Sequence, residues 1–179
     1  MTQAANTYAQ ALYTLAKEER LSEQILNELD VLKQAFDREP DFVRLLSAPN
    51  LPKAERCGIL DESFRGKVHI YVLNFLKILS EKGYIRQFSD CCKAYCEHYN
   101  ADNGILTVQA VTAVALTEEQ SARLTEKLAK QTGKTVALVN RIDPSVLGGV
   151  RLDYDGKRVD GTVKNRLDTI GNLLKNTVL

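Results

Sequence analysis

The sequence predicts an α+β protein, with an N-terminal six-helix bundle followed by a small C-terminal domain that has a mixed sheet and two helices. Three observations support this prediction. Apolar residues recur at helical spacing from residue 4 to about residue 100. The turn-forming run Asp102-Asn103-Gly104 follows. Beyond it the apolar residues alternate and many are β-branched, which is typical of strands. We therefore predict domains over residues 1–104 and 105–179.

The first helix, predicted over residues 4–18, has a wide apolar surface. Two neighbouring strips run along it, with Ala4, Tyr8, Ala11 and Leu15 on one and Ala5, Ala9, Leu12 and Ala16 on the other. Together the strips span about 160°, whereas a helix that covers one core needs a stripe of about 100°. The second helix, over residues 22–36, has a single seam of Ile25, Leu29, Leu32 and Phe36.

Prolines divide the chain after the second helix into short pieces, and they lie at Pro40, Pro49 and Pro52. Further helices are predicted over residues 53–64, 68–82 and 86–100. Apolar residues cover about half the circumference of the middle one, and Gly83 is placed to end it. Because the loops are short, the helices of this half should form a compact bundle.

The second half is predicted to form strands around one helix. Residues 105–114 and 136–142 have the strand pattern, and between them Thr117 and Gln120 form a capping box that opens a helix to about residue 130. Val136, Leu138 and Ile142 are predicted to share one face of the second strand. Two more strands, 146–154 and 157–160, flank the hairpin turn Asp155-Gly156. Val163, Leu167, Ile170 and Leu174 make the closing helix amphipathic.

Composition restricts the function only mildly. The 179 residues are 44% hydrophobic and 26% charged, which is enough to bury one or two cores. The formal net charge is +1, so no strong field favours nucleic acid or anionic lipid. Residues 1–104 have 13 lysines and arginines against 15 acidic residues, and residues 105–179 have 11 against 8. The net charge thus changes from −2 in the first half to +3 in the second, which suggests that the two halves contact different surfaces.

Targeting and membrane-spanning segments are not expected. No apolar run approaches the roughly 18–20 residues of a membrane-spanning helix. The N-terminus has neither the basic start and apolar stretch of a signal peptide nor the length and arginines of an organelle transit peptide, unless a mature form has lost one. We therefore expect a protein that is soluble and intracellular, or attached to a membrane only through other proteins.

Two motifs resemble nucleotide-binding loops but lack required residues. Gly133-Lys134-Thr135 has Leu128 where a phosphate loop needs its first glycine, and it leads into a strand instead of a helix. Gly148-Gly149 does not stand in the GxGxxG frame of a dinucleotide fingerprint. We interpret Gly133 as a helix C-cap and the glycine pair as a bulge or a close backbone approach. No cofactor is expected.

Reactive side chains do not form a recognisable catalytic or metal site. His69 and His98 are isolated in helical patterns, so we interpret them as solvated or interfacial. Asp153, Asp155 and Asp160 could form a carboxylate cluster. However, Asp155 belongs to the hairpin turn, and Asp153 alternates onto the polar face of its strand. Three of the four cysteines, Cys91, Cys92 and Cys96, form one cluster without the second ligand pair of a zinc site, which favours reduced core thiols at these positions and at Cys57.

The apolar surfaces of residues 4–16 and 68–79 exceed what one bundle core requires. Both segments could be central helices that their neighbours cover on all sides. Alternatively, they lie side by side and leave a groove for an amphipathic helix of a partner, with Tyr8 and Tyr71 suited to its rim. The pattern alone leaves both interpretations open.

Several stretches resemble one family. Residues 142–152, IDPSVLGGVRL, and residues 159–167, VDGTVKNRL, look like the signature of the ATP synthase delta subunit family, called OSCP in mitochondria. The N-terminal run Tyr8-Ala9-Gln10-Ala11-Leu12-Tyr13 is similar to the opening Y-A-x-A-L/F of that family, and residues 75–83 resemble its fifth helix. Length and domain order agree as well, so the resemblance covers essentially the whole chain.

The resemblance implies a non-catalytic stator subunit of the F1Fo ATP synthase. In that family the N-terminal bundle binds the N-terminal helix of an alpha subunit between its first and fifth helices. The C-terminal domain binds the C-terminal ends of the b subunits, with the beta subunit as a further candidate contact. Matching by position assigns the groove to Tyr8, Ala11, Leu15, Tyr71, Phe75 and Ile78. The same matching gives structural roles to the residues of the C-terminal signature. Gly148 and Gly149 would permit a close approach or a bulge, and Asp160, Gly161 and Thr162 would form a turn that caps the closing helix.

The resemblance also implies a location. The protein would be peripheral on the cytoplasmic side of a bacterial membrane, or on the stromal side of a thylakoid if a transit peptide has been removed, without inserting into the bilayer. Two alternatives remain from the residues themselves. A helical RNA-binding or regulatory adaptor would need a basic stripe, whereas residues 1–104 are net acidic. A small enzyme would need a convergent polar pocket.

Overall fold

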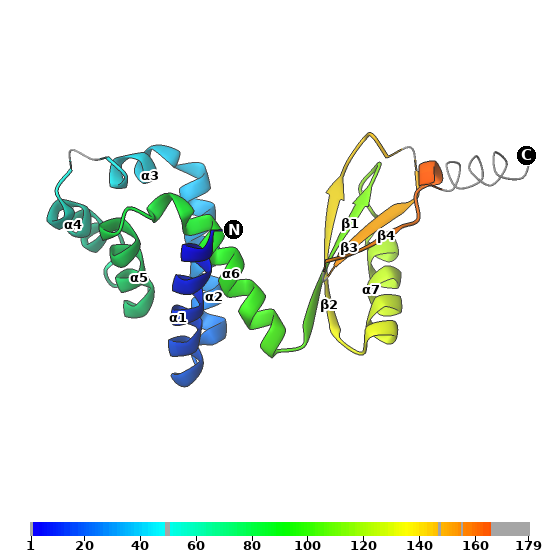
Figure 1. Ribbon diagram of the computed structural model, residues 1–179, viewed down its shortest axis with the longest axis horizontal. Helices are drawn as coiled ribbons and strands as arrows, with labels where there is room; N and C mark the ends of the chain where they lie inside the picture. The colour runs from blue at the N-terminus through cyan, green and yellow to red at the C-terminus, as the bar shows by residue number, and fades with distance from the viewer. Residues whose placement is uncertain (1, 49–50, 147, 155, 166–179) are drawn as a thin grey trace, which may run out of the picture. The chain divides into compact units, whose positions relative to one another are not determined.

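The computed structural model describes residues 2–48, 51–146, 148–154 and 156–165, and it divides into two compact units, Met1–Tyr99 and Asn100–Leu179 (Figure 1). This division falls within the helix α6, Phe88–Asp102, whereas the sequence placed the domain boundary at the turn after that helix. The α+β class is confirmed: the first unit is helical and the second has a mixed four-stranded sheet.

The described part of the first unit consists of helices joined by short loops. Their bounds are α1 Gln3–Glu18, α2 Ser22–Arg38, α3 Pro40–Leu46, α4 Lys53–Phe64, α5 Ile70–Glu81, the 3₁₀ turn η1 Ile85–Gln87 and α6 Phe88–Asp102. With η1 and with α7 of the second unit, the described chain has eight labelled helical segments, apart from the helical residues 163–165. Six α-helices therefore form the first unit, as the sequence predicts.

Two predicted helix starts need correction. The helix α5 begins at Ile70 and not at Val68, because His69 is its N-cap and accepts a hydrogen bond from the amide of Tyr71 through Nδ1 at 3.3 Å. The carboxylate of Glu28 in α2 holds this cap, accepting from the amide of His69 at 2.7 Å. Similarly, α6 starts after the 3₁₀ turn η1 and not at Arg86.

The core of the first unit is formed by the two seams that the sequence identifies. In α1 the strip Ala5, Ala9, Leu12 and Ala16 is at most 6% exposed, and in α2 the seam Ile25, Leu29, Leu32 and Phe36 is at most 7% exposed. Cys91 and Cys92 of α6 lie in the same core. Loss of hydration raises the pKa of the Cys91 thiol to about 11, so this thiol stays protonated at neutral pH.

Arg56 of α4 links three segments of the first unit. Its Nε donates to the carbonyl oxygen of Leu51 at 3.1 Å, and its Nη1 donates to those of Ser80 at 3.1 Å and Leu46 at 3.5 Å. Leu46 and Ser80 lie in the last turns of α3 and α5, where helices leave carbonyl groups without intrahelical partners. The Arg56 guanidinium therefore gives the C-terminal ends of α3 and α5 both a positive charge and hydrogen-bond donors.

Arg56→Met is expected to lower the free energy of unfolding of the first unit by about 2–3 kcal/mol, because it keeps the aliphatic stem and removes the charged donors. Urea denaturation followed by far-ultraviolet circular dichroism measures this change. Arg65→Met is the matched control, since the Arg65 side chain is 74% exposed and pairs only with Asp61 of its own helix region. Equal losses in the two variants would contradict the linking role of Arg56.

The second unit is a sheet with one helix on one face (Figure 1). Its elements are β1 Ile105–Thr112, α7 Glu118–Thr132, β2 Thr135–Ile142, β3 Val150–Tyr154 and β4 Lys157–Asp160. The strand order is β2-β1-β3-β4, with β1 parallel to β2 and the other pairs antiparallel. Leu128 of α7 packs on Leu106, Val108 and Ala110 of β1. The capping box of Thr117 and Gln120 is confirmed, as is Gly133 as the C-cap of α7 with φ +66°.

One expectation for the strands is wrong. The third strand begins at Val150 and not at residue 146, because Asp143 turns the chain by accepting the amide of Ser145 at 3.0 Å. Ile142 alternates onto the same face of β2 as Val136 and Leu138, as the sequence predicts, but it is 54% exposed at the end of this outer strand. In the closing helix only residues 163–165 are described as helical, and Leu167, Ile170 and Leu174 lie outside the described residues, as does Asp155.

Candidate functional site

The second apolar strip of α1 lies on the surface of the first unit. Ala11 is exposed, Leu15 is 36% exposed and Tyr8 is half-buried. These residues lie about 100° around the helix from the buried strip, at 100° per residue. The helix therefore uses one strip for its own core and leaves the other accessible.

The helix α5 also has an exposed apolar face, though its centre differs from the predicted one. Ile78 is 43% exposed and Tyr71 is half-buried, whereas Phe75 is only 6% exposed and belongs to the core. Ile70, which the sequence argument did not select, is 54% exposed. Ile70, Asn74 and Ile78 follow one another at four-residue steps on the exposed side, a spacing that could have identified Ile70.

Two contacts connect α1 with the segment that follows α5. The rings of Tyr8 and Tyr84 lie with their centroids 5.9 Å apart, and the hydroxyl of Thr2 donates to the side-chain carbonyl of Gln87. The buried sides of α1 and α5 belong to one core cluster. Their exposed and half-buried apolar residues on the surface, which we call the α1/α5 surface, are Tyr8, Ala11, Leu15, Ile70, Tyr71 and Ile78. The alternative interpretation required neighbouring helices to cover α1 and α5 on all sides. In the structure neither helix is covered in this way.

The glycine pair of the C-terminal signature lies against the chain that follows β4. Gly149 has φ +84°, and a Cβ atom there would be 2.5 Å from the carbonyl oxygen of Gly161. Two hydrogen bonds hold these stretches together: the amide of Gly161 donates to Val150 and the amide of Val163 donates to Gly148, each at 3.0 Å. The absence of a side chain at position 149 therefore permits this close approach.

Asp160 and Thr162 organise the start of the closing helix. The carboxylate of Asp160 accepts the amide of Thr162 at 2.9 Å, and the hydroxyl of Thr162 accepts the amide of Asn165 at 3.3 Å. The side-chain and backbone hydrogen bonds from Thr162 keep the pKa of Asp160 below its usual range. Thr162 itself is 6% exposed. These contacts are local, and they join the end of β4 to the first residues of the closing helix.

The histidines and cysteines have structural surroundings in the described chain. His69 caps α5, and His98 stacks on Tyr13 with ring centroids 6.0 Å apart while its Nε2 lies 3.2 Å from Asn6 Oδ1. Among the described residues, no group of three or more His, Cys, Asp or Glu side chains is arranged to hold a metal ion. A search of the same residues finds no helix with the length and apolar character to cross a bilayer.

The fold and its surface define a two-unit α+β protein whose helical unit has an exposed apolar surface on two helices. The chain belongs to the ATP synthase delta (OSCP) subunit family, whose model matches residues 4–174. The match spans both units and confirms the resemblance read from the sequence.

Relatives and a solved structure agree with this assignment over nearly the full chain. The ATP synthase subunit delta of Alkaliphilus oremlandii is 33% identical over 172 residues, which cover 96% of each chain. That of Lactobacillus delbrueckii subsp. bulgaricus is 36% identical over 176 residues, also with 96% of each covered. A chain in the cryo-EM structure of the Toxoplasma gondii mitochondrial ATP synthase hexamer superimposes with a TM-score of 0.74 at 18% identity, covering 97% of this chain and 98% of that one. This last likeness concerns the fold.

Proposed function

We propose that the chain is the non-catalytic stator subunit of an F1Fo ATP synthase, linking the F1 head to the b subunits of the peripheral stalk. It resists rotor torque during proton-driven ATP synthesis and takes no part in the chemistry itself. The observation that supports this most directly is membership of the delta (OSCP) family over residues 4–174. The comparisons give no support to an RNA-binding adaptor.

The α1/α5 surface is the proposed site for the N-terminal helix of an alpha subunit. Tyr8, Ala11 and Leu15 would contact it from α1, and Tyr71 and Ile78 from α5, with Ile70 extending the same surface. Phe75 lies beneath as part of the core and supports the site without being its main contact. Small Ala11 allows a partner helix to approach closely, and exposed aliphatic side chains supply apolar area that binding removes from water.

The second unit is the proposed partner of the b subunits. Residues 105–179 have a net charge of +3, opposite in sign to residues 1–104, which suits two different partners. The beta subunit is a further contact of the head in this proposal. The chain would act as a peripheral subunit on the cytoplasmic side of a bacterial membrane, or on the stromal side of a thylakoid.

Reconstitution tests this proposal. Membranes depleted of their delta subunit should lose ATP-driven proton pumping and regain it when the purified chain and F1 are added together. F1 without the chain should remain soluble and still hydrolyse ATP. Restored pumping without the chain would overturn the proposal, and so would salt-dependent retention of RNA by the chain together with failure to sediment with F1.

A further inference from the structure

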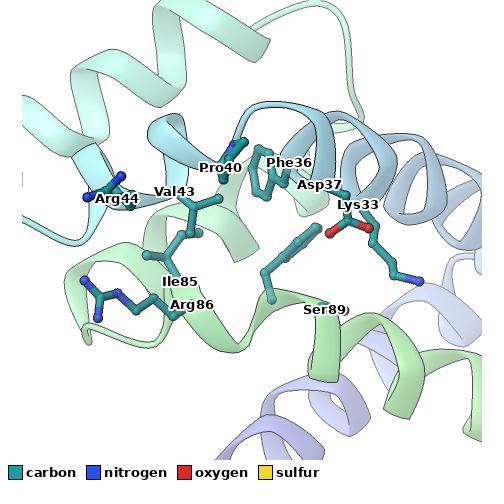
Figure 2. A pocket seen from close by; sticks show the side chains of 10 residues that line it. Lys33, Phe36, Asp37, Pro40, Val43, Arg44, Ile85, Arg86 and Ser89 are labelled. Atoms are coloured by element: carbon teal, nitrogen blue, oxygen red, sulfur yellow. The ribbon is translucent and has the colours of Figure 1, made fainter.

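A pocket of about 350 Å³ lies in the first unit between α2, α3, η1 and the start of α6 (Figure 2). None of its lining residues belongs to α1 or α5, so it is separate from the α1/α5 surface. Its floor is apolar, because Phe36, Ile85 and Phe88 line it while being at most 7% exposed themselves. An apolar floor of this kind accepts an apolar side chain.

The rim of this pocket is basic although the surrounding half of the chain is acidic. Lys33, Arg44 and Arg86 line it, against the single carboxylate of Asp37. Figure 2 shows Arg44 and Arg86 at one end of the pocket, with Lys33 and Asp37 at the other. Residues 1–99, which form this unit, have 13 lysines and arginines against 14 acidic residues, so the positive end is a local reversal of sign. An acidic partner would therefore be attracted to this end of the pocket.

The two arginines at this end are available for a ligand. Among the described residues Arg86 has no hydrogen-bond or ion-pair partner. Arg44 donates to Asp41 at 3.0 Å, but the two side chains are 78% and 85% exposed, and such an ion pair contributes little and exchanges readily. A guanidinium can bind a carboxylate through two parallel hydrogen bonds, which fixes the orientation of the ligand.

We propose that this pocket binds an acidic segment of a partner polypeptide, in which a carboxylate lies next to an apolar side chain. The apolar side chain occupies the floor over Phe36 and Phe88, and the carboxylate pairs with Arg86 and Arg44. At the opposite end Asp37 offsets the charge of Lys33, so the carboxylate is favoured at the arginine end, which sets the direction of the segment. A nucleic acid fits less well, because it requires a basic stripe longer than one pocket end.

Fluorescence anisotropy of the full chain with a labelled peptide of Glu-Leu-Glu-Phe repeats tests this inference. The peptide is expected to bind, and the same peptide with lysine in place of glutamate is not. Arg86→Glu should weaken binding by about tenfold or more, since it replaces an attraction with a repulsion. The matched control Arg38→Glu changes an exposed arginine of the same unit outside the pocket and should alter the affinity by less than about twofold.

Several results would overturn the inference. Equal weakening by Arg86→Glu and Arg38→Glu would indicate attraction by overall charge instead of a pocket. Displacement of the acidic peptide by an apolar helix bound to the α1/α5 surface would place the peptide at that surface, and tighter binding of a single-stranded RNA would indicate a different class of ligand. Both arginine side chains are exposed, so neither substitution should unfold the chain, and circular dichroism verifies this.

Discussion

Ala11→Asp is expected to weaken binding of the alpha-subunit N-terminal helix by about a hundredfold, which corresponds to about 3 kcal/mol. Ala11 is exposed in the free chain, so an aspartate there is hydrated and leaves the fold intact. In the complex the partner helix would cover it, and the charge would lose its water without gaining a partner. Isothermal titration calorimetry of the full chain with a peptide of that helix measures the loss.

Gln10→Asp is the matched control for this substitution. It introduces the same charge one residue earlier in α1, but Gln10 lies about 130° around the helix from the centre of the Tyr8, Ala11 and Leu15 strip. Both variants lower the helix propensity of α1 by less than about 1 kcal/mol, so their thermal stabilities should be similar. Unchanged affinity in Ala11→Asp, or an equal loss in Gln10→Asp, would remove α1 from the proposed site.

The helices with one continuous seam are the part of the fold that the sequence predicts best. Ile25, Leu29, Leu32 and Phe36 are all buried in α2. Their spacing puts them on one face of the helix, and a helix with a single apolar face packs that face on the core. The start of α5 was misplaced because it depends on the hydrogen bond between Glu28 and His69, which are 41 residues apart. Periodicity within one helix contains no information on such a contact.

The α1/α5 surface could be predicted only where it follows from the width of the apolar face of a helix. The two strips of α1 are wider than one core needs, and the structure indeed buries one and exposes the other. In α5 eight of the twelve residues are apolar and they lie all round the helix, so the pattern could not decide which side faces outwards. Neighbouring helices decide it, burying Phe75 and exposing Ile70. The basic pocket was not predicted, because Lys33, Arg44 and Arg86 come from three elements that only the fold brings together.

Gly149→Ala is expected to destabilise the second unit by about 2–5 kcal/mol. Its φ of +84° costs a side chain about 1–2 kcal/mol, and the added Cβ would lie 2.5 Å from the carbonyl oxygen of Gly161 and 2.9 Å from the Cα of Thr162. Both neighbours are backbone atoms, so the clash can be relieved only by separating the two stretches. Separation would stretch the hydrogen bond from the Gly161 amide to Val150. Hydrogen exchange of the β1 amides, at the centre of the sheet, reports this loss for the second unit alone.

Gly156→Ala separates the cost of the positive φ from the cost of the steric clash. Gly156 has a similar φ of +69°, but a Cβ there would have no heavy atom within 4 Å. This variant should therefore lose only the conformational part, about 1 kcal/mol, and the difference between the two variants measures the steric part. If both lost the same stability, the close approach at Gly149 would not limit the fold. If Gly149→Ala lost more, the glycine of the signature would be explained by packing of the backbone, with no need for a role in contacting the stalk.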